Sequence, residues 1–276
     1  MNKIKITLTK EKQTLLIPLY TRALESLKPN PVIIDPKASE ILDKIDYHFN
    51  SLNFSAQTIA ALCMRANKID LSVKEFINAN PDGIIIHAGC GLDSRFIRTG
   101  NNTIQWYDLD YPEVINLRRH FYKETPKYKM ISSSVTDINW IKKIKSYNKA
   151  ADNKPVMFIA EGLMMYLQEK DVKNIILNLE KFFPGSEIIF DVYNTFAANQ
   201  INLHPAIINT GAVLKWGIDN TKDILQWSSQ IKLKQEWLFI HSDDLIKLPF
   251  HVRIFFYCTA LFPLMRNSHR IIHLQV

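Results

Sequence analysis

The sequence predicts a doubly wound α/β fold: a mostly parallel, seven-stranded sheet with helices on both faces and helical caps. Short runs of apolar, β-branched residues, such as Val156–Ala160, alternate with stretches that have the period of an amphipathic helix. Strands without polar alternation are typical of parallel sheets that helices cover on both sides. This rhythm starts near residue 81 and stops after Val192, so the flanking segments are expected to be caps.

Residues 1–80 are predicted to form an N-terminal helical cap. Amphipathic periods indicate three helices there, over residues 10–28, 36–49 and 56–78. Asp35 followed by Pro36 is typical of a helix start, because the carboxylate accepts a bond from a free backbone N–H and proline has no N–H to leave unpaired. Ser55 is expected to cap the third helix in the same way.

The remaining residues divide into a core and two further segments. Residues 194–230 lose the strand–helix rhythm and are predicted to be a cap insertion, helical or irregular. Residues 231–276 are expected to hold two C-terminal strands, at 231–240 and 270–276, with a lid between them. In the core, residues 81–193, we expect strands at 84–86, 103–109, around 130, 156–160 and 187–192, and helices at 112–122, 137–146 and 168–182.

Composition excludes several classes of protein. The net charge is +7, but the basic residues form no stripe, so we expect no nucleic-acid partner. The longest apolar run lies between Arg253 and Arg266 and is shorter than the roughly 20 residues of a membrane span. We expect a buried or lid segment there, with a membrane-surface helix as the much less favoured alternative. Three cysteines and no leader of signal-peptide type predict a cytoplasmic protein. The eight histidines show no metal-site spacing, so no metal is expected.

Two glycines and an acid indicate a ligand that contains a nucleoside. Gly89 and Gly91 follow the first core strand, where glycine lets the backbone approach a ligand closely. Asp110 ends the next strand, where an acid accepts hydrogen bonds from ribose hydroxyls. The alternative for Asp110 is that it caps the helix that Pro112 opens.

The loop also indicates which nucleoside. Asp93, at the start of the following helix, would repel a pyrophosphate. The cationic, phosphate-free S-adenosylmethionine suffers no such repulsion. An NAD(P)-dependent oxidoreductase is the alternative. Glu161, after the fourth strand, lies where ligands bind in open α/β sheets, either to hold the cofactor's amino group or to cap the next turn.

The chain resembles the leucine carboxyl methyltransferase family, particularly its bacterial branch of tetracenomycin-type polyketide O-methyltransferases. The resemblance covers nearly the whole chain. It rests on these blocks: Tyr20-Thr21-Arg22-Ala23, Asp35-Pro36-Lys37-Ala38, Asp46-Tyr47, Ala88–Arg95, Trp106–Val114 with Arg118-Arg119, Ala160–Leu167 and Lys215–Ile218.

The resemblance implies a role for each matching position. Arg65 would grip the cofactor's carboxylate, and Gly89 and Glu161 would lie near its methionine portion. Asp110 would bind the ribose, with Asp108 the less favoured choice. Related enzymes place an Asp-Leu pair beside adenine, and this chain has Ser134 and Val135 there instead.

The implied activity is O-methylation of a hydroxyl or carboxyl group on a small aromatic or polyketide-like molecule, as in secondary metabolism. A carboxyl methyltransferase of a protein C-terminus and a non-catalytic S-adenosylmethionine-binding protein are the alternatives. No general base is identified: Tyr166, Tyr193, His204 and His241 are considered only by position. The sequence gives no oligomeric state. We expect a closed acceptor cavity bounded by the cap. The candidates for its lining are Trp216, Trp227, Phe255 and Phe256, with core packing as the alternative for each.

Overall fold

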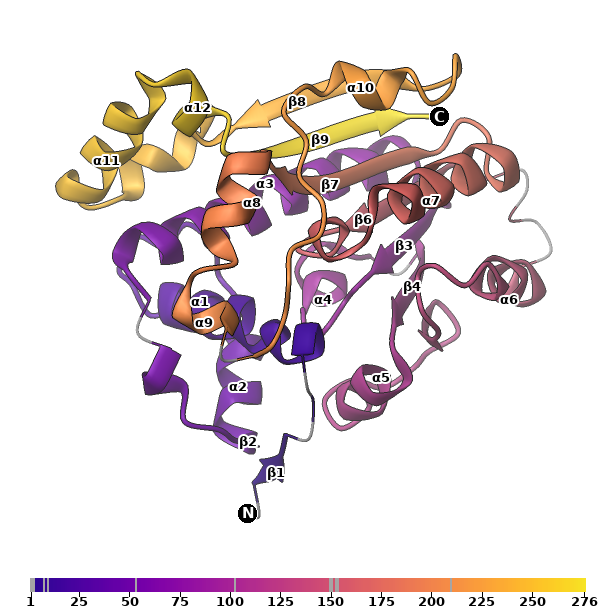
Figure 1. Cartoon of the computed structure of the whole chain (residues 1–276). Helices are drawn as coiled ribbons and strands as arrows, with labels where there is room; N and C mark the ends of the chain where they lie inside the picture. The colour runs from indigo at the N-terminus through magenta and orange to yellow at the C-terminus, as the bar shows by residue number, and fades with distance from the viewer. Residues whose placement is uncertain are drawn as a thin grey trace.

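The computed structural model describes residues 3–6, 8, 10–52, 54–101, 103–148, 151, 154–208 and 210–276. Its centre is a seven-stranded sheet in the order β5-β4-β3-β6-β7-β9-β8 (Figure 1). All neighbouring strands are parallel except that β9 runs antiparallel to both β7 and β8. The predicted fold class is thereby confirmed. The strands are β3 (Ile84–Ala88), β4 (Gln105–Asp110), β5 (Tyr128–Ser132), β6 (Val156–Ala160), β7 (Glu187–Tyr193), β8 (Lys232–Leu238) and β9 (His269–Gln275).

The order of the strands creates a switch point beside β3. From β3 the chain builds outward through β4 to β5, then returns to the other side of β3 with β6 and continues to β7. In open α/β sheets a ligand binds at such a point, outside the carboxyl ends of the strands. Gly89, Asp110 and Glu161 all lie at these carboxyl ends, on neighbouring strands.

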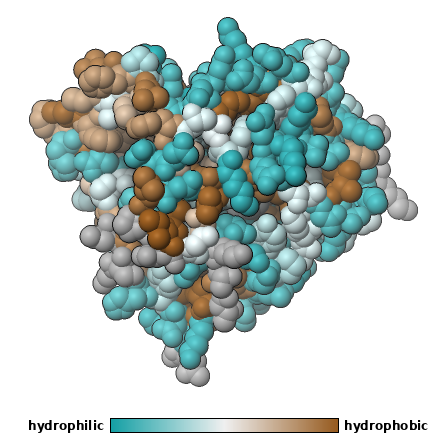
Figure 2. All heavy atoms as spheres, viewed as in Figure 1, coloured by the Kyte–Doolittle hydropathy of each residue, from teal (hydrophilic) through white to brown (hydrophobic). Residues whose placement is uncertain are grey.

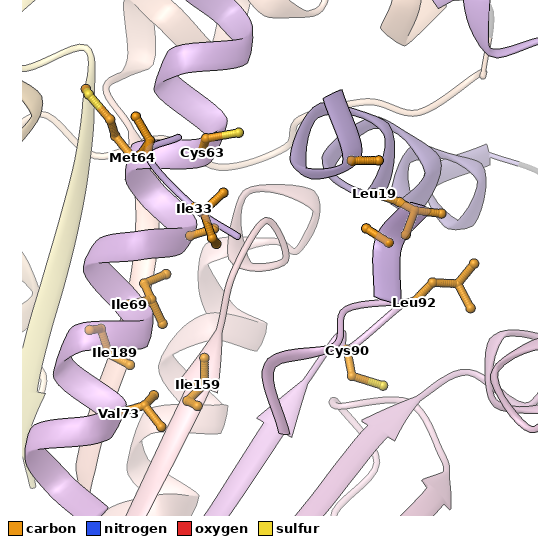
Figure 3. Close-up of a cluster of buried hydrophobic side chains, with 14 of the residues drawn as sticks. Leu19, Ile33, Cys63, Met64, Ile69, Val73, Cys90, Leu92, Ile159 and Ile189 are labelled. Carbon is orange, nitrogen blue, oxygen red and sulfur yellow. The ribbon is translucent and has the colours of Figure 1, made fainter. Parts of the chain in front are cut away.

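Helices cover both faces of the sheet because successive strand residues point to opposite sides. Ile85 belongs to one buried cluster, together with side chains of α1, α3 and α5. Its neighbours Ile84 and Ile86 belong to the other, together with side chains of α6 and α7. Figure 3 shows the first cluster, in which Val73 and Ile69 of α3 lie against the strands. The helices are α1 (Leu16–Ser26), α3 (Ala56–Ala79), α4 (Arg95–Thr99), α5 (Pro112–Arg118), α6 (Asn139–Tyr147) and α7 (Glu169–Phe182).

The N-terminal cap follows the predicted pattern with two differences. Asp35 caps α2 (Pro36–Lys44) and Ser55 caps α3, each through a side-chain oxygen that accepts a backbone N–H. The first predicted helix starts as a 3₁₀ segment, η1 (Lys10–Leu15), before α1 begins. The second ends five residues early, because β2 (Ile45–Asp46) pairs with β1 (Ile4–Lys5). The core helix expected to reach residue 122 likewise ends at Arg118.

The two late segments occupy different places. The insertion carries α8 (Thr195–Ile201), α9 (Pro205–Ile208) and α10 (Lys222–Leu225), and α8 and α9 lie over the open end of the sheet beside α1 (Figure 1). Between β8 and β9, α11 (Phe250–Ala260) and α12 (Pro263–Arg266) project from one corner of the molecule. Among the described residues, no helix is both long and apolar enough to cross a membrane.

Candidate functional site

A cavity of about 430 Å³ lies at the carboxyl ends of β3, β4, β6 and β7. Its floor includes Gly89, Asp110, Glu161 and Tyr193, one from the end of each strand. Its walls come from η1, α1, α3 and the insertion. Pockets for small molecules are commonly of this size. The sheet and the cap segments therefore enclose one site between them.

The loop after β3 needs its two glycines. Gly89 and Gly91 have φ of +63° and +48°, the left-handed region that side chains rarely adopt. A Cβ on Gly89 would lie 3.1 Å from Leu163 Cδ1, and one on Gly91 would lie 3.1 Å from Leu15 Cβ. The bare backbone of this loop therefore forms part of the cavity floor.

Asp110 faces both this loop and the cavity. Its carboxylate accepts the backbone N–H of Gly91 at 2.8 Å and that of Tyr111 at 2.7 Å. Burial raises the pKa of Asp110 to about 6, although both backbone donors oppose the shift. Each carboxylate oxygen can accept a further bond, so Asp110 has capacity left for two ligand hydroxyls.

Asp108 is turned away from the cavity. It is fully buried, accepts from Trp106 Nε1 at 2.8 Å and from the Tyr128 hydroxyl at 2.5 Å, and pairs with Arg118. Asp108 and Asp110 are two residues apart on β4, so both point to the same face of the sheet, but Asp108 lies further from the carboxyl end of the strand. Its contacts are those of a structural carboxylate.

Beside the loop lies a buried charge network. Ten ion pairs join four arginines to five carboxylates, and no side chain in it is more than 10% exposed. With five negative and four positive charges, the network carries one net negative charge. Of the carboxylates in this network, Glu161 and Asp93 line the cavity. The members are Arg22, Arg65, Arg95, Arg98, Asp35, Asp70, Asp93, Glu161 and Asp191.

Arg65 and Glu161, both predicted to bind the cofactor, are bonded to each other. Arg65 Nε donates to Glu161 Oε1 at 3.0 Å, and its Nη1 donates to Asp191 Oδ2 at 2.8 Å. Arg95 holds the second oxygen of Glu161. Arg65 and Glu161 both line the cavity. Asp191 also accepts the Gly162 N–H at 2.6 Å, and Arg65 with His269 holds the pKa of Asp191 well below its usual range despite burial.

Ser134 and Val135 lie apart from these residues. They do not line the cavity. The Ser134 hydroxyl is 2.8 Å from that of Thr136, and the Val135 carbonyl accepts from Trp140 Nε1. Their role beside adenine stays a prediction.

Three of the four residues considered as bases line the cavity: Tyr166, Tyr193 and His204. His241 does not. Burial raises the pKa of Tyr166 and of Tyr193, so both phenols keep their protons at neutral pH.

Sequence reasoning missed His269. It starts β9, lines the cavity and stacks on Tyr193 with ring centroids 4.2 Å apart. Its Nε2 lies 2.8 Å from Asp191 Oδ2, and burial lowers its pKa, so the ring is neutral. Only the antiparallel pairing of Tyr193 with His269 brings it there, and no local motif announces that pairing.

None of the four aromatic residues considered as cavity lining lines the cavity. Trp216 packs on Phe190 and Trp227 in the cluster on the other face of the sheet. Phe256 packs on Phe239, and Phe255 is exposed. A tertiary backbone contact holds this segment, since the N–H groups of both Lys215 and Trp216 bond to the Met165 carbonyl. Of these two neighbours, Lys215 lines the cavity and Trp216 enters the core. The insertion instead contributes Ile201, His204, Ile207, Leu214 and Lys215 to the lining.

Known sequences resemble this chain over most of its length. The family model described as leucine carboxyl methyltransferase matches residues 16–180. The tetracenomycin polyketide synthesis O-methyltransferase TcmP of Streptomyces glaucescens is 32% identical over 86% of this chain and 86% of its own length. The S-adenosyl-L-methionine-dependent methyltransferase dpfgK of Gibberella zeae is 28% identical over 87% of this chain and 86% of its own.

Solved structures share the fold. A duf574 family protein from Streptomyces avermitilis superposes with a TM-score of 0.60 at 10% identity, over 95% of this chain and 96% of that one. A SAM-dependent methyltransferase from Anabaena variabilis does so with a TM-score of 0.51 at 12% identity, over 83% of this chain and 96% of that one. At such identities the likeness concerns the fold alone.

Proposed function

Because the chain belongs to the leucine carboxyl methyltransferase family and is an S-adenosylmethionine-dependent O-methyltransferase, we propose that its acceptor is a small aromatic or polyketide-like molecule. The methylated oxygen belongs to a hydroxyl or a carboxyl group. The observation that carries the proposal is a single cavity whose floor is polar and whose cap wall is apolar. Three cysteines, none in a disulfide, support our further proposal of a cytoplasmic location.

The polar floor fits S-adenosylmethionine by charge. This cofactor has a carboxylate, an ammonium and a sulfonium, hence one net positive charge, and the network beside the loop has one net negative charge. We assign the ribose to Asp110, the ammonium to Glu161 and the carboxylate to Arg65, all of which line the cavity. Arg65 has five N–H donors and a planar fork that suits a carboxylate.

S-adenosylmethionine, when bound, supplies a methyl group on a positively charged sulfur. The protein's part is to orient the acceptor oxygen behind that methyl group. Orientation of this kind contributes up to roughly 7–11 kcal/mol in favourable cases. The rigid strand ends hold the cofactor side, and the insertion holds the acceptor side.

His269 is our proposed base for a hydroxyl acceptor. With Asp191 ionised, Nε2 carries the ring hydrogen, and Nδ1 has the free lone pair. As the O–CH₃ bond forms, the hydroxyl proton would pass to Nδ1, and Asp191 would stabilise the resulting cation. A carboxylate acceptor is already ionised and needs no base.

The cap wall supports a small acceptor over a protein C-terminus. Ile201, Ile207 and Leu214 face the cavity as an apolar wall, and His204 and Lys215 are the polar groups near them. Pockets for small molecules commonly combine apolar walls with a few polar anchors.

The test is turnover on matched acceptors. Purified protein with S-adenosylmethionine would be given aromatic compounds in pairs that differ only in carrying a hydroxyl or a carboxyl group, alongside peptides with a free C-terminus. Methylation would be followed by mass spectrometry and by release of S-adenosylhomocysteine. Methylated aromatic compounds support the proposal. Methylation confined to peptides would make the protein C-terminus the acceptor and overturn it.

A further inference from the structure

The corner formed by α11 and α12 is covered with exposed apolar side chains. Figure 2 shows brown and tan atoms at the upper left, where Figure 1 places these two helices. Leu261 is 77% exposed and Phe262 63% exposed, values that few large apolar residues of this chain reach. We call this the α11–α12 surface, and its members are Phe250, Ile254, Phe255, Tyr257, Leu261, Phe262, Leu264 and Met265.

The core does not require these side chains. One side of α11 anchors the helix, since Val252 and Phe256, one turn apart, are buried, and Phe256 stacks near Phe239. Ile254, Phe255 and Tyr257 on the remaining sides are exposed. A helix that is apolar all round normally lies inside a protein or against lipid. Here one side is packed and the rest is uncovered.

The charged side chains in the segment that carries this surface are all basic. The sequence has no Asp or Glu from Leu245 to Val276. Arg266 is exposed at the end of α12, and Arg253 stacks on the Phe250 ring, 5.9 Å from its centroid. Two copies meeting through this patch about a two-fold axis would bring like charges together. The patch is therefore suited to an anionic partner and not to itself.

We propose that the α11–α12 surface binds the face of an anionic lipid bilayer, as a peripheral contact and not a span. Interfacial helices combine a basic rim with Phe and Leu side chains that enter the boundary between headgroups and acyl chains. Basic residues near such a surface strengthen the attraction to anionic headgroups. The net charge of +7 acts in the same direction.

The surface is also connected to the cavity. The Leu264 carbonyl accepts from Asn194 Nδ2 at 2.9 Å, and the same Asn194 caps α8 of the insertion. After α12 the chain leads directly into His269, on the cavity wall. A bilayer bound at this corner would thus lie beside the segment that forms the acceptor wall.

Vesicle binding tests the proposal, and Cys258 supplies a probe. Cys258 is exposed on α11, whereas Cys63 and Cys90 are buried. An environment-sensitive dye on Cys258 is expected to shift to the blue with vesicles of phosphatidylglycerol and phosphatidylcholine in equal parts, and much less with phosphatidylcholine alone. Co-sedimentation of the unlabelled protein checks that the dye does not create the binding.

Matched variants locate the contact. Leu261→Asp is expected to weaken vesicle binding at least about tenfold, because it puts an anion where the wild type would insert an apolar side chain into the anionic bilayer. Leu27→Asp is the control, since Leu27 is 78% exposed, follows the last residue of α1 and is not part of the α11–α12 surface. The affinity of this variant should stay within about twofold of the wild type. Arg266→Glu should weaken binding to the anionic vesicles and leave the weak binding to neutral ones unchanged.

Three results would overturn the proposal. One is no binding to anionic vesicles by either measurement. Another is equal loss for Leu261→Asp and Leu27→Asp. The third is a concentration-dependent dimer in analytical ultracentrifugation that Leu261→Asp abolishes, because a second copy would then cover the surface. None of these readouts depends on methyl transfer, so they stand apart from the proposed acceptor.

Discussion

The two ends of the cavity are built in opposite ways. The floor is made of strand ends, two glycines and a network of ten buried ion pairs. The cap wall is made of short helices and irregular chain that present apolar side chains. The cofactor is charged and is the same in every reaction, so charges held in fixed positions at the strand ends can bind it. A variable acceptor suits a wall where each side chain contributes little, and changes there should alter specificity without disturbing the cofactor.

The sharpest test of the floor is to break its network. Arg95 is fully buried and pairs with Asp70, Asp93 and Glu161. Arg95→Met should lower the free energy of unfolding by about 3–5 kcal/mol, because it leaves buried carboxylates uncompensated. Urea denaturation measures this. Arg119→Met, at an exposed arginine, should change stability by under about 0.5 kcal/mol. A loss below about 1 kcal/mol for Arg95→Met would mean that the floor does not rely on its charges.

The next effect is expected where floor and wall meet, at His269. For a hydroxyl acceptor, His269→Gln should lower kcat by about 100-fold, the low end of the range for a general base. For the matched carboxyl acceptor the change should be small. The pH profile of kcat, measured at saturating S-adenosylmethionine so that protonation of Asp110 does not enter, separates a base from a structural residue. The wild type should lose activity as His269 becomes protonated at low pH, and the variant should not show that loss. Equal losses on both acceptors would make His269 structural.

Asp110 should matter more for the cofactor than any single residue of the wall. Asp110→Ala removes a charged acceptor, and charge-assisted bonds contribute about 1.5–3 kcal/mol each. We expect S-adenosylmethionine to bind about 30-fold more weakly, by roughly 2 kcal/mol, in calorimetry. Asp110→Asn, which keeps one oxygen toward the loop, should lose less. Wild-type affinity in Asp110→Ala would remove the ribose assignment.

Cofactor affinity should also depend on pH through the same residue. The pKa of Asp110 is raised to about 6, by burial first, while Arg118 and Asp108 act on it in opposite directions. The ionised form is the one that accepts two hydroxyls, so affinity should be full above pH 6 and fall as pH drops through it. The limiting slope is about tenfold per pH unit. Asp110→Asn should flatten the curve, and an unchanged slope would assign the titration to another group.

The smallest effect is expected in the wall. Ile201→Ala should raise the KM for the acceptor about fivefold, roughly 1 kcal/mol of lost apolar contact, and leave S-adenosylmethionine affinity unchanged. Ile208→Ala is the matched control, because Ile208 is 57% exposed and does not line the cavity. If Ile201→Ala weakened the cofactor as much as Asp110→Ala does, the division between floor and wall would be wrong.

The site residues that the sequence predicts best are those at the ends of the strands. Gly89, Asp110 and Glu161 could be placed beside one another because parallel strands present their carboxyl ends at one edge of the sheet. The lengths of the cap helices are harder to predict from the sequence. The helix that begins at Pro36 ends early because residues 45–46 pair with a strand forty residues before them, and the helical period alone does not contain that competition.

The direction in which each side chain of the insertion points cannot be predicted from the sequence either. Lys215 and Trp216 are neighbours in sequence, yet one lines the cavity and the other enters the core. Irregular chain has no fixed period, so composition pointed to the larger aromatic residue as the lining one. The backbone bonds of both residues to Met165 decide the outcome.

Local periodicity and local turn chemistry predict the fold class and the residues that stand at the ends of the strands. Which charges meet depends on tertiary contacts. Arg65 reaches Glu161 across 96 residues and Asp191 across 126, and His269 reaches Asp191 across 78. Such pairs depend on the register of distant strands and on how a helix packs over them. A buried charge is stable only beside an opposite charge. The fold sets which charged residues become neighbours, so their spacing along the chain does not predict the pairs.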